Sequence, residues 1–251
     1  MRSLGAGGGG VTVPNATNVY LSTITWPQVA AHRMTTTRYG ENTIQSGLVQ
    51  LASGVEVLDG DFWFSSDGVA TMMHDSTIDR TTNGSGTVSA LTWAQLSSYA
   101  VDAGSGYNAQ PIPQLSDLVV FKGSAIVTVE HKPGPGVSEV EALADSLAGM
   151  EDTLIVQSFW GTATEAWRDA GFTALVLHNT PDLAASLFGD GYEWVGHEFT
   201  GSGTSDQIDL IEESKAAGLK VMTYTHSTLS DANAAIAAGA DMANLDNPSG
   251  R

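Results

Sequence analysis

The sequence predicts an α/β fold, a (β/α)₈ barrel of the TIM type with a small loop excursion near residues 97–114. Short apolar runs of strand length alternate with stretches of helical periodicity, which is typical of βαβ units around a parallel sheet. The chain has 251 residues, about the usual size of one such barrel. Three helix-like stretches end at Gly171, Gly218 and Gly239, and each is soon followed by an apolar run, as glycine caps leading into strands would be.

The elements can be placed in chain order. The expected strands share short runs of aliphatic and β-branched residues, at 29–31, 55–58, 70–73, 125–129, 154–156, 174–177 and 221–224. The expected helical stretches lie at 48–51, 140–147, 163–170, 208–217 and 232–238. No internal repeat or second composition regime is visible. We therefore expect one barrel domain, residues 19–251, after a flexible N-terminal segment, residues 1–18, that contains a glycine run.

Composition limits the partners of the chain. Ten Lys and Arg residues stand against 28 Asp and Glu, a formal net charge of −18. Such a field repels nucleic acid and anionic membranes. One interpretation is that the acidic excess serves solubility. If the substrate is anionic, positive charge must instead be concentrated at its binding site. No run of 18 apolar residues and no secretory signal is visible. We expect a soluble chain whose compartment and oligomeric state stay open, and the lack of cysteine excludes thiolate metal sites.

Histidines follow two of the expected strands. His32 and Arg33 come directly after the run 29–31, and His74 and Asp75 end the run 70–73. Residues just after a barrel strand lie at the carboxyl-terminal rim, where the active sites of barrel enzymes lie. A single pair of this kind is more often an ordinary surface pair. Each pair therefore indicates an active site only in combination with the other polar clusters at strand ends.

Carboxylates follow a third expected strand. Asp59 and Asp61 are spaced by two, which places both side chains on one face of a strand. Two adjacent carboxylates need a cation between them or a shared proton, and hard oxygen ligands suit Ca²⁺ or Mg²⁺. The same Asp-Gly-Asp segment is also typical of a turn, and the spacing leaves both interpretations open.

A fourth cluster contains a carboxylate and an ammonium group. Glu130 and Lys132 flank His131, again on one face, and could hold a metal ion and a phosphate oxygen or simply pair with each other. His131 points to the opposite face and is interpreted as structural. Two histidines with a divalent metal suit phosphoryl transfer, and the cations would stabilise charge on the phosphate. No P-loop, G-x-S-x-G or H-E-x-x-H motif is present.

The sequence resembles the glycerophosphodiester phosphodiesterase family from His32 to Pro248. Ordered motifs at matching spacing carry the resemblance: His32-Arg33 with Glu41-Asn42-Thr43, Asp59-Gly60-Asp61, Ser65-Ser66-Asp67-Gly68, His74-Asp75, the stretch 79–86, Ile112-Pro113-Gln114-Leu115, Glu130-His131-Lys132, Gln157-Ser158-Phe159, Gly239-Ala240-Asp241 and Asp246-Asn247-Pro248. The resemblance implies the phospholipase-C-like type of phosphodiesterase barrel. It also implies metal-dependent hydrolysis of glycerophosphodiesters to glycerol 3-phosphate and an alcohol, through attack of the glycerol 2-hydroxyl and a cyclic phosphate.

The resemblance assigns roles by residue. His32 and His74 would be the general acid–base pair, and Asp59, Asp61 and Glu130 would bind Ca²⁺ or Mg²⁺, with Mn²⁺ a further candidate. The residues that would contact a small-molecule or polymeric phosphodiester substrate are Arg33, Lys132, Gln157, Phe159 and Tyr224.

Three departures from the family pattern bear on these roles. Asp59 replaces a glutamate, so its carboxylate reaches about 1.5 Å less, one C–C bond. Met34 replaces a glycine. If the backbone there needs positive φ, the methionine would be strained, and its bulk is expected to change the pocket floor. Tyr224 replaces a tryptophan and can still pack on the glycerol. His197 and His226 are additional histidines that we interpret as structural or rim residues.

Two alternatives remain open. The barrel could be a catalytically weak binding module for glycerol-phosphate polymers, which the substitutions at Asp59 and Met34 favour and the retained histidines oppose. It could also be a related phospholipase or lyase that stops at the cyclic phosphate, although no basic amphipathic helix for a membrane substrate is visible. The alcohol leaving group is not determined by these residues.

Overall fold

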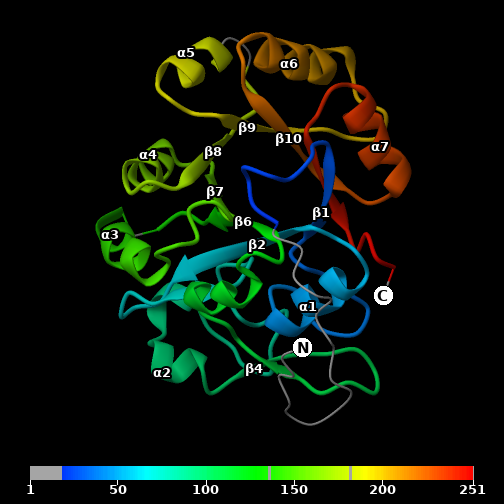
Figure 1. The fold of residues 1–251 in the computed structure, drawn as a ribbon. Helices are drawn as coiled ribbons and strands as arrows, with labels where there is room; N and C mark the ends of the chain where they lie inside the picture. Colours follow the sequence, from blue (N-terminus) through cyan, green and yellow to red (C-terminus); the bar gives the residue numbers. More distant parts are fainter. Residues whose placement is uncertain (1–18, 135–136, 181–182, 251) are drawn as a thin grey trace.

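The computed structural model describes residues 19–134, 137–180 and 183–250. In these residues eight parallel strands form one sheet that closes because the first strand pairs with both the second and the last. The barrel strands are β1 (Gln28–His32), β2 (Val57–Phe64), β6 (Ile126–His131), β7 (Leu154–Ser158), β8 (Thr173–Leu177), β9 (Trp194–Glu198), β10 (Lys220–His226) and β11 (Met242–Asp246). The predicted TIM-type barrel is confirmed (Figure 1).

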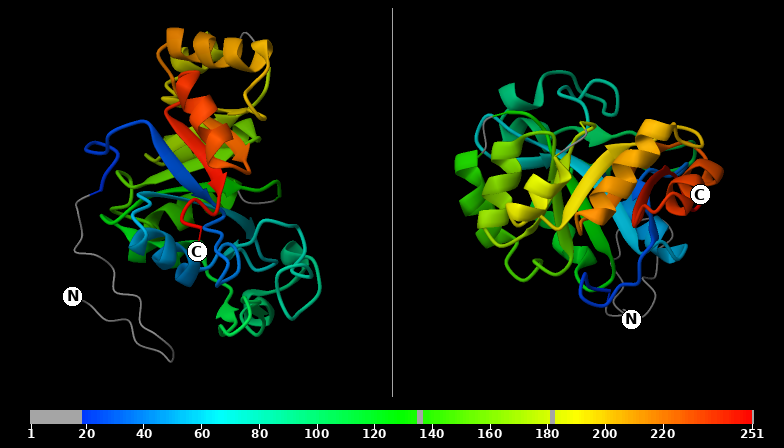
Figure 2. Two further views of the ribbon diagram at one scale, coloured as in Figure 1. Left: turned by 90° about the vertical axis from the view of Figure 1, so that its right-hand side faces the viewer. Right: turned by 90° about the horizontal axis from the view of Figure 1, so that it is seen from above.

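Helices connect successive strands, as right-handed parallel crossovers require. They are α1 (Ile44–Ala52), the 3₁₀ helix η2 (Leu115–Phe121), α3 (Val137–Ser146), α4 (Gly161–Asp169), α5 (Ala184–Gly189), α6 (Ser205–Ala216) and α7 (Leu229–Ala237). Figures 1 and 2 show helices α3 to α7 following one another around the outside of the strands. Gly171, Gly218 and Gly239 follow α4, α6 and α7 with φ of +91°, +99° and +114°, so the predicted glycine caps are confirmed.

The segment 70–73 was expected to be a barrel strand, and that prediction is wrong. Its residues form β3 (Ala70–Met72), which runs antiparallel to β2. The chain reverses because Asp67 Oδ1 accepts a hydrogen bond from the Ser65 hydroxyl at 2.7 Å and Gly68 takes φ of +81°. β2 therefore extends beyond its last pair with β6. β3 runs back along β2, and this brings His74 close to Asp61.

Two barrel strands and two of the connecting helices, α5 and η2, escaped prediction. β9 and β11 contain histidine, asparagine and acidic residues, which interrupt the apolar pattern of a buried strand. Helix α5 has six residues, too few for a helical period to be recognised.

The expected loop excursion is larger than residues 97–114. The chain between β3 and η2 contains a 3₁₀ helix η1 (Val88–Ala90), α2 (Trp93–Leu96) and a two-stranded sheet of β4 (Ala100–Val101) and β5 (Gln110–Pro111). It has a small apolar cluster of its own that includes Ile78, Leu96 and Ile112. The proposed flexible segment, residues 1–18, lies outside the described residues. In the part of the chain that is described, no helix combines the length and apolarity that crossing a bilayer requires.

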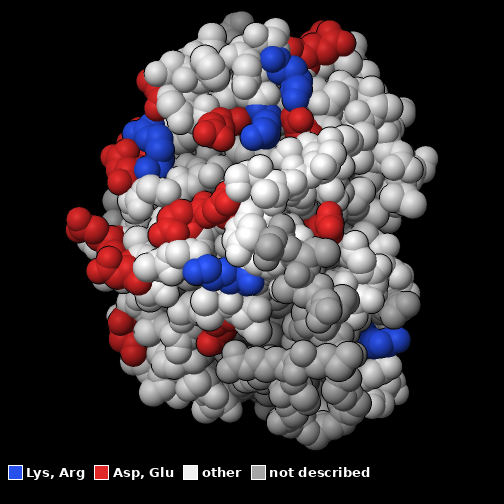
Figure 3. Space-filling model, in the orientation of Figure 1, with Lys and Arg blue, Asp and Glu red and all other residues white. Residues whose placement is uncertain are grey.

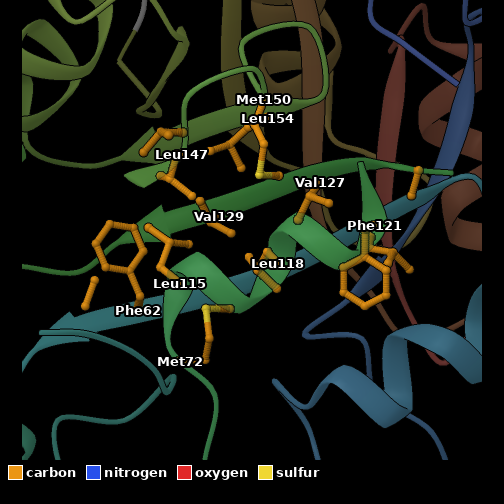
Figure 4. Close-up of a cluster of buried hydrophobic side chains, with 14 of the residues drawn as sticks. Phe62, Met72, Leu115, Leu118, Phe121, Val127, Val129, Leu147, Met150 and Leu154 are labelled. Carbon is orange, nitrogen blue, oxygen red and sulfur yellow. The ribbon is translucent and has the colours of Figure 1, made fainter. Parts of the chain in front are cut away.

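The main apolar core lies between the barrel wall and its outer layer. Figure 4 shows Leu115, Leu118 and Phe121 of η2 alongside Val127 and Val129 of β6. These side chains are almost fully buried. Their packing fixes the direction of β2 and β6, the two strands that carry the acidic residues of the pocket.

Met34 belongs to this core and not to the pocket. Its backbone has φ of 55°, so Met34 does adopt the left-handed conformation in which a methionine is strained. The side chain is fully buried, and a Cβ placed on Gly47 would lie 3.0 Å from its sulfur. The expectation that Met34 changes the pocket floor is therefore wrong, because the thioether fills the space left by a helix glycine. Its contacts offset the cost of the left-handed backbone, on the order of 1 kcal/mol.

The fold is expected to lose stability as the pH falls from 6.5 to 4, in part through His178. Burial and the neighbouring His197 lower the pKa of His178 from 6.5 to about 4. In this window the unfolded chain therefore binds more protons than the folded one, and stability falls with pH. In His178→Gln the slope of unfolding free energy against pH should decrease by up to about 1.4 kcal/mol per unit, the value for one proton. Denaturant unfolding at several pH values measures this slope, and an unchanged slope would contradict it.

Candidate active site

A cavity of about 210 Å³ opens at the carboxyl ends of the barrel strands. Its lining contains all ten site residues predicted from the sequence: His32, Arg33, Asp59, Asp61, His74, Glu130, Lys132, Gln157, Phe159 and Tyr224. It also contains four that were not predicted: Leu177, Met222, Thr225 and Asn244. His197 and His226 do not line this cavity and are 1% exposed, so both lie within the packed structure, as expected for structural histidines.

His32 is held by a carboxylate from the last strand. Its Nδ1 lies 2.7 Å from Asp246 Oδ1, and the two residues are register partners on β1 and β11. Because a carboxylate only accepts, Nδ1 carries the proton and Nε2 is the nitrogen left for a ligand. Burial opposes the charged imidazole, but the bond to Asp246 and the charges of Asp59 and Asp61 together outweigh it, and the pKa of His32 is raised. His32 is therefore suited to donate a proton.

His74 is also bonded to a carboxylate through Nδ1, but its Nε2 has a partner as well. Its Nδ1 lies 2.8 Å from Asp75 Oδ1, and its Nε2 lies 2.9 Å from a terminal nitrogen of Arg33. A guanidinium only donates, so Nε2 accepts and the ring is neutral with its proton on Nδ1. His74 in this state can take a proton at Nε2 once Arg33 moves away.

The contacts of His74 and Arg33 close into a ring of five residues. Arg80 donates to Asp75 from Nε at 2.6 Å and to both carboxylate oxygens of Glu41 at 2.7 and 3.0 Å. Glu41 also lies 3.5 Å from Arg33, which completes the ring. The bonds from Arg80 and His74 hold the pKa of Asp75 well below its usual range. The orientation of His74 thus depends on a residue that does not line the pocket.

Replacing Arg80 by methionine should lower kcat about 10- to 100-fold with little change in KM, the effect expected when a residue orienting a catalytic group is lost. Asp75 would then lose the partner that fixes it toward His74. Steady-state kinetics measure the effect. Arg168→Met is the matched control, since Arg168 pairs with Asp169 outside the pocket. Equal kcat values in the two variants would show that Arg80 has no positioning role.

Three ionisable groups meet near the point where the pairing of β2 with β6 ends. Asp61 and Glu130 are register partners, and Lys132 Nζ lies 2.9 Å from the first and 2.7 Å from the second. Burial alone would raise the pKa of Asp61, but Lys132 lowers it below the usual range. Burial dominates at Glu130 and raises its pKa to about 7 despite Lys132. The ion pair is therefore chiefly one between Lys132 and Asp61.

Asp59 lies deeper than Asp61 and is bonded on both oxygens. Its Oδ1 accepts from the Thr128 hydroxyl at 2.6 Å and from Gln157 Nε2 at 2.8 Å, while the backbone N–H of Arg33 lies 3.4 Å from Oδ2. Burial raises the pKa of Asp59, which is 2% exposed. The Asp59 carboxylate is thus held in the barrel wall by side chains of β6 and β7.

The donor chemistry of the pocket suits a divalent cation. Asp61 and Glu130 already have a cationic group between them, the Lys132 ammonium, and Asp59 adds a third carboxylate to the same pocket. Gln157 contributes a buried amide oxygen, Oε1, that has no partner among the described residues. In the described ranges, however, no group of three or more histidine, aspartate or glutamate side chains lies close enough together to hold a metal.

Aromatic rings form one side of the pocket. Phe159 follows β7 and packs edge-on against Tyr224 of β10, with ring centroids 6.0 Å apart. Phe159 is 57% exposed, so its ring lies at the mouth. On the face drawn in Figure 3, Lys and Arg side chains do not gather into a patch. Positive charge is instead placed in the pocket by Arg33 and Lys132, as an anionic substrate in an acidic protein requires.

Comparisons with known proteins agree with this geometry. Residues 32–249 match the model of the glycerophosphoryl diester phosphodiesterase family. The chain is 30% identical over 139 residues to a glycerophosphodiester phosphodiesterase of Caldanaerobacter subterraneus, an alignment that covers 52% of this chain and 57% of that protein. It is 23% identical to an uncharacterised Bacillus subtilis protein, YqiK, over 85% of this chain and 92% of the relative. The chain thus matches little more than half of the first relative's length.

Solved structures show the same fold. A phosphodiesterase of Oleispira antarctica, solved in complex with the product sn-glycerol-3-phosphate, superposes with a TM-score of 0.78 at 24% identity, covering 89% of this chain and 94% of that one. A glycerophosphodiester phosphodiesterase of Agrobacterium tumefaciens superposes with a TM-score of 0.71 at 24% identity, covering 88% and 97%.

Proposed function

We propose that this chain, which belongs to the glycerophosphoryl diester phosphodiesterase family, hydrolyses glycerophosphodiesters to glycerol 3-phosphate and an alcohol by two-histidine acid–base catalysis. One observation carries the proposal: two histidines share a pocket with Arg33 and Lys132, and although each is bonded to a carboxylate through Nδ1, Nε2 of His32 is left for a ligand while Nε2 of His74 accepts from Arg33. A base and an acid whose environments differ in this way are what an internal displacement at phosphorus needs. The product bound by the Oleispira antarctica relative is consistent with it.

In the first step Arg33 exchanges its bond to His74 for a phosphate oxygen. The freed Nε2 of His74 takes the proton of the glycerol 2-hydroxyl, whose oxygen forms a bond to phosphorus. The bond from phosphorus to the alcohol oxygen breaks, and His32 gives its Nε2 proton to that oxygen. Arg33 and Lys132 stabilise the negative charge on the phosphate oxygens during the displacement.

In the second step the roles of the histidines reverse. His32, now neutral, takes a proton from water, and the water oxygen forms a bond to phosphorus. The bond from phosphorus to the 2-oxygen breaks, and His74 returns its proton to that oxygen. Glycerol 3-phosphate leaves, and both histidines are back in their starting states.

Members of this family generally depend on a divalent metal ion. Asp61 and Glu130, joined by Asp59, are the residues of this chain that we propose hold the ion, Ca²⁺ or Mg²⁺ with Mn²⁺ as a further candidate, because all three are oxygen donors in the pocket. Bound there, the metal would supply positive charge that stabilises the phosphate in the transition state. Lys132, paired with Asp61 in its absence, would be released to contact the phosphate.

The test is release of glycerol 3-phosphate from glycerophosphocholine, glycerophosphoglycerol and teichoic-acid fragments, measured with Ca²⁺, Mg²⁺ or Mn²⁺ present. We expect turnover with at least one diester and one metal. A protein that binds these diesters in calorimetry and turns over none would be a binding module. A cyclic phosphate as the final product would make it a lyase.

A further inference from the structure

Asn244 occupies the deep part of the pocket. It lies on β11 two residues before Asp246, so both side chains are on the same face of the strand. Its register partner on β1 is Ala30, one step below the paired His32 and Asp246. Asp246 has a side chain 48% exposed at the rim, whereas Asn244 is 2% exposed and still lines the cavity. Asn244 is thus at the floor beneath His32.

The carboxamide oxygen of Asn244 lacks a partner among the described residues. Its Oδ1 is buried and accepts no hydrogen bond from any residue that the structure describes. Buried polar groups in proteins are nearly always bonded, because leaving one unpaired costs its full desolvation. Two other residues that line the pocket, Leu177 and Met222, are apolar and offer no side-chain hydrogen bond. A group that enters the pocket is the remaining partner.

Gln157 repeats this pattern on the other side of the barrel. Its Nε2 donates to Asp59, which fixes the carboxamide, and its buried Oε1 has no partner in the described residues. The pocket therefore presents two carboxamide oxygens without a partner in the described residues, in addition to its charged groups. Charged groups suit the phosphate, whereas neutral carboxamides suit hydroxyl groups, which both donate and accept.

We propose that Asn244 binds the terminal hydroxyl of the substrate's glycerol, with Gln157 as a second polar contact, and so selects diesters in which that hydroxyl is free. The proposal rests on the proposed function, in which the 2-hydroxyl is the nucleophile and the terminal hydroxyl takes no part in the chemistry. A diester that lacks this hydroxyl, or carries an acyl chain on it, would leave Asn244 unpaired in the closed floor. The preferred substrates are thus deacylated glycerophosphodiesters and not lysophospholipids.

The experiment compares glycerophosphocholine with the phosphocholine diester of propane-1,2-diol. The second compound keeps the nucleophilic 2-hydroxyl and the leaving group, and only the terminal hydroxyl is replaced by hydrogen. We expect wild-type kcat/KM to be roughly 10- to 100-fold higher for the glycerol diester, the range for leaving a buried polar group unpaired. A 1-acyl lysophosphatidylcholine should be a poorer substrate than either.

Asn244→Leu, a change of similar size, should bring this ratio to within about threefold of one, chiefly by lowering kcat/KM for glycerophosphocholine. Asn233→Leu, the same substitution at an exposed position of α7, should leave the ratio as in wild type. Asn244→Ala serves if the leucine variant does not fold. A wild-type ratio near one, or an unchanged ratio in a folded Asn244 variant, would overturn the proposal.

Product binding separates this proposal from the proposed function. Calorimetry with glycerol 3-phosphate and propane-1,2-diol 1-phosphate should show the same 10- to 100-fold preference in wild type and its loss in Asn244→Leu. If neither diester is turned over but the binding preference holds, the hydrolytic function fails while the hydroxyl site stands. If diesters are hydrolysed without a preference in turnover or binding, the hydroxyl site fails and the function stands.

Discussion

Replacing His32 by alanine is expected to lower kcat on glycerophosphocholine by about 10³-fold, within the range for loss of a general acid or base. His32 would protonate the departing choline oxygen, which is otherwise expelled as a strongly basic alkoxide. KM should change little, because in the proposed mechanism it is Arg33 and Lys132 that bind the phosphate. Steady-state kinetics of the variant measure both constants.

The leaving group distinguishes this role from a general loss of structure. A 4-nitrophenyl glycerol phosphate diester expels a weakly basic phenolate that needs little protonation, so His32→Ala should retain far more of its activity on it. His74→Ala should be slow on both diesters, since the nucleophile is the same. His178→Gln removes a histidine outside the pocket lining and should keep full activity at pH 7. An equal loss on both diesters in His32→Ala would contradict the acid role.

Chelation of divalent metal should lower activity by a factor of about 10² or more, because charge stabilisation by a metal is worth several kcal/mol at a phosphate. Activity should return when Ca²⁺, Mg²⁺ or Mn²⁺ is added in excess. Asp61→Asn should raise the metal concentration needed for half-maximal activity, because one carboxylate is lost from a site where Asp61 faces Glu130 across Lys132. Activity titrations against free metal give this concentration for each variant.

The control for the metal titration is Asp206→Asn, which removes a carboxylate from the exposed surface of α6 and should titrate like wild type. Full activity of thoroughly chelated protein would show that Lys132, Arg33 and the histidines are sufficient. Asp61→Asn would then act only by freeing Lys132 from its ion pair.

Part of the pocket could be predicted from local sequence patterns. Asp59 and Asp61 share a face because strand side chains alternate, and the same rule placed Glu130 beside Lys132. His32 was placed at the rim because it ends an apolar run. These predictions depend only on residues within one strand, and all of these side chains line one cavity.

The remaining features depend on contacts between distant parts of the chain. His32 and Asp246 are 214 positions apart, and nothing in either segment indicates the partner until the barrel closes. His74 reaches the pocket through a hairpin that was mistaken for a barrel strand. Arg80 is bonded to Glu41, 39 positions away. Asn244 could have been placed on the pocket face by counting back two residues from Asp246. Its role as a binding residue is indicated only by the lack of a partner for its oxygen in the described part of the chain, which the sequence does not show.

The most direct measurement is a ³¹P NMR time course of glycerophosphocholine with metal-loaded protein. Wild type should convert the diester to glycerol 3-phosphate, and folded His32→Ala and His74→Ala proteins should each leave it almost unchanged over the same period. Hydrolysis at wild-type rates by either variant would contradict a mechanism that depends on both histidines. The absence of glycerol 3-phosphate from wild type with every metal and diester tested would contradict the function itself.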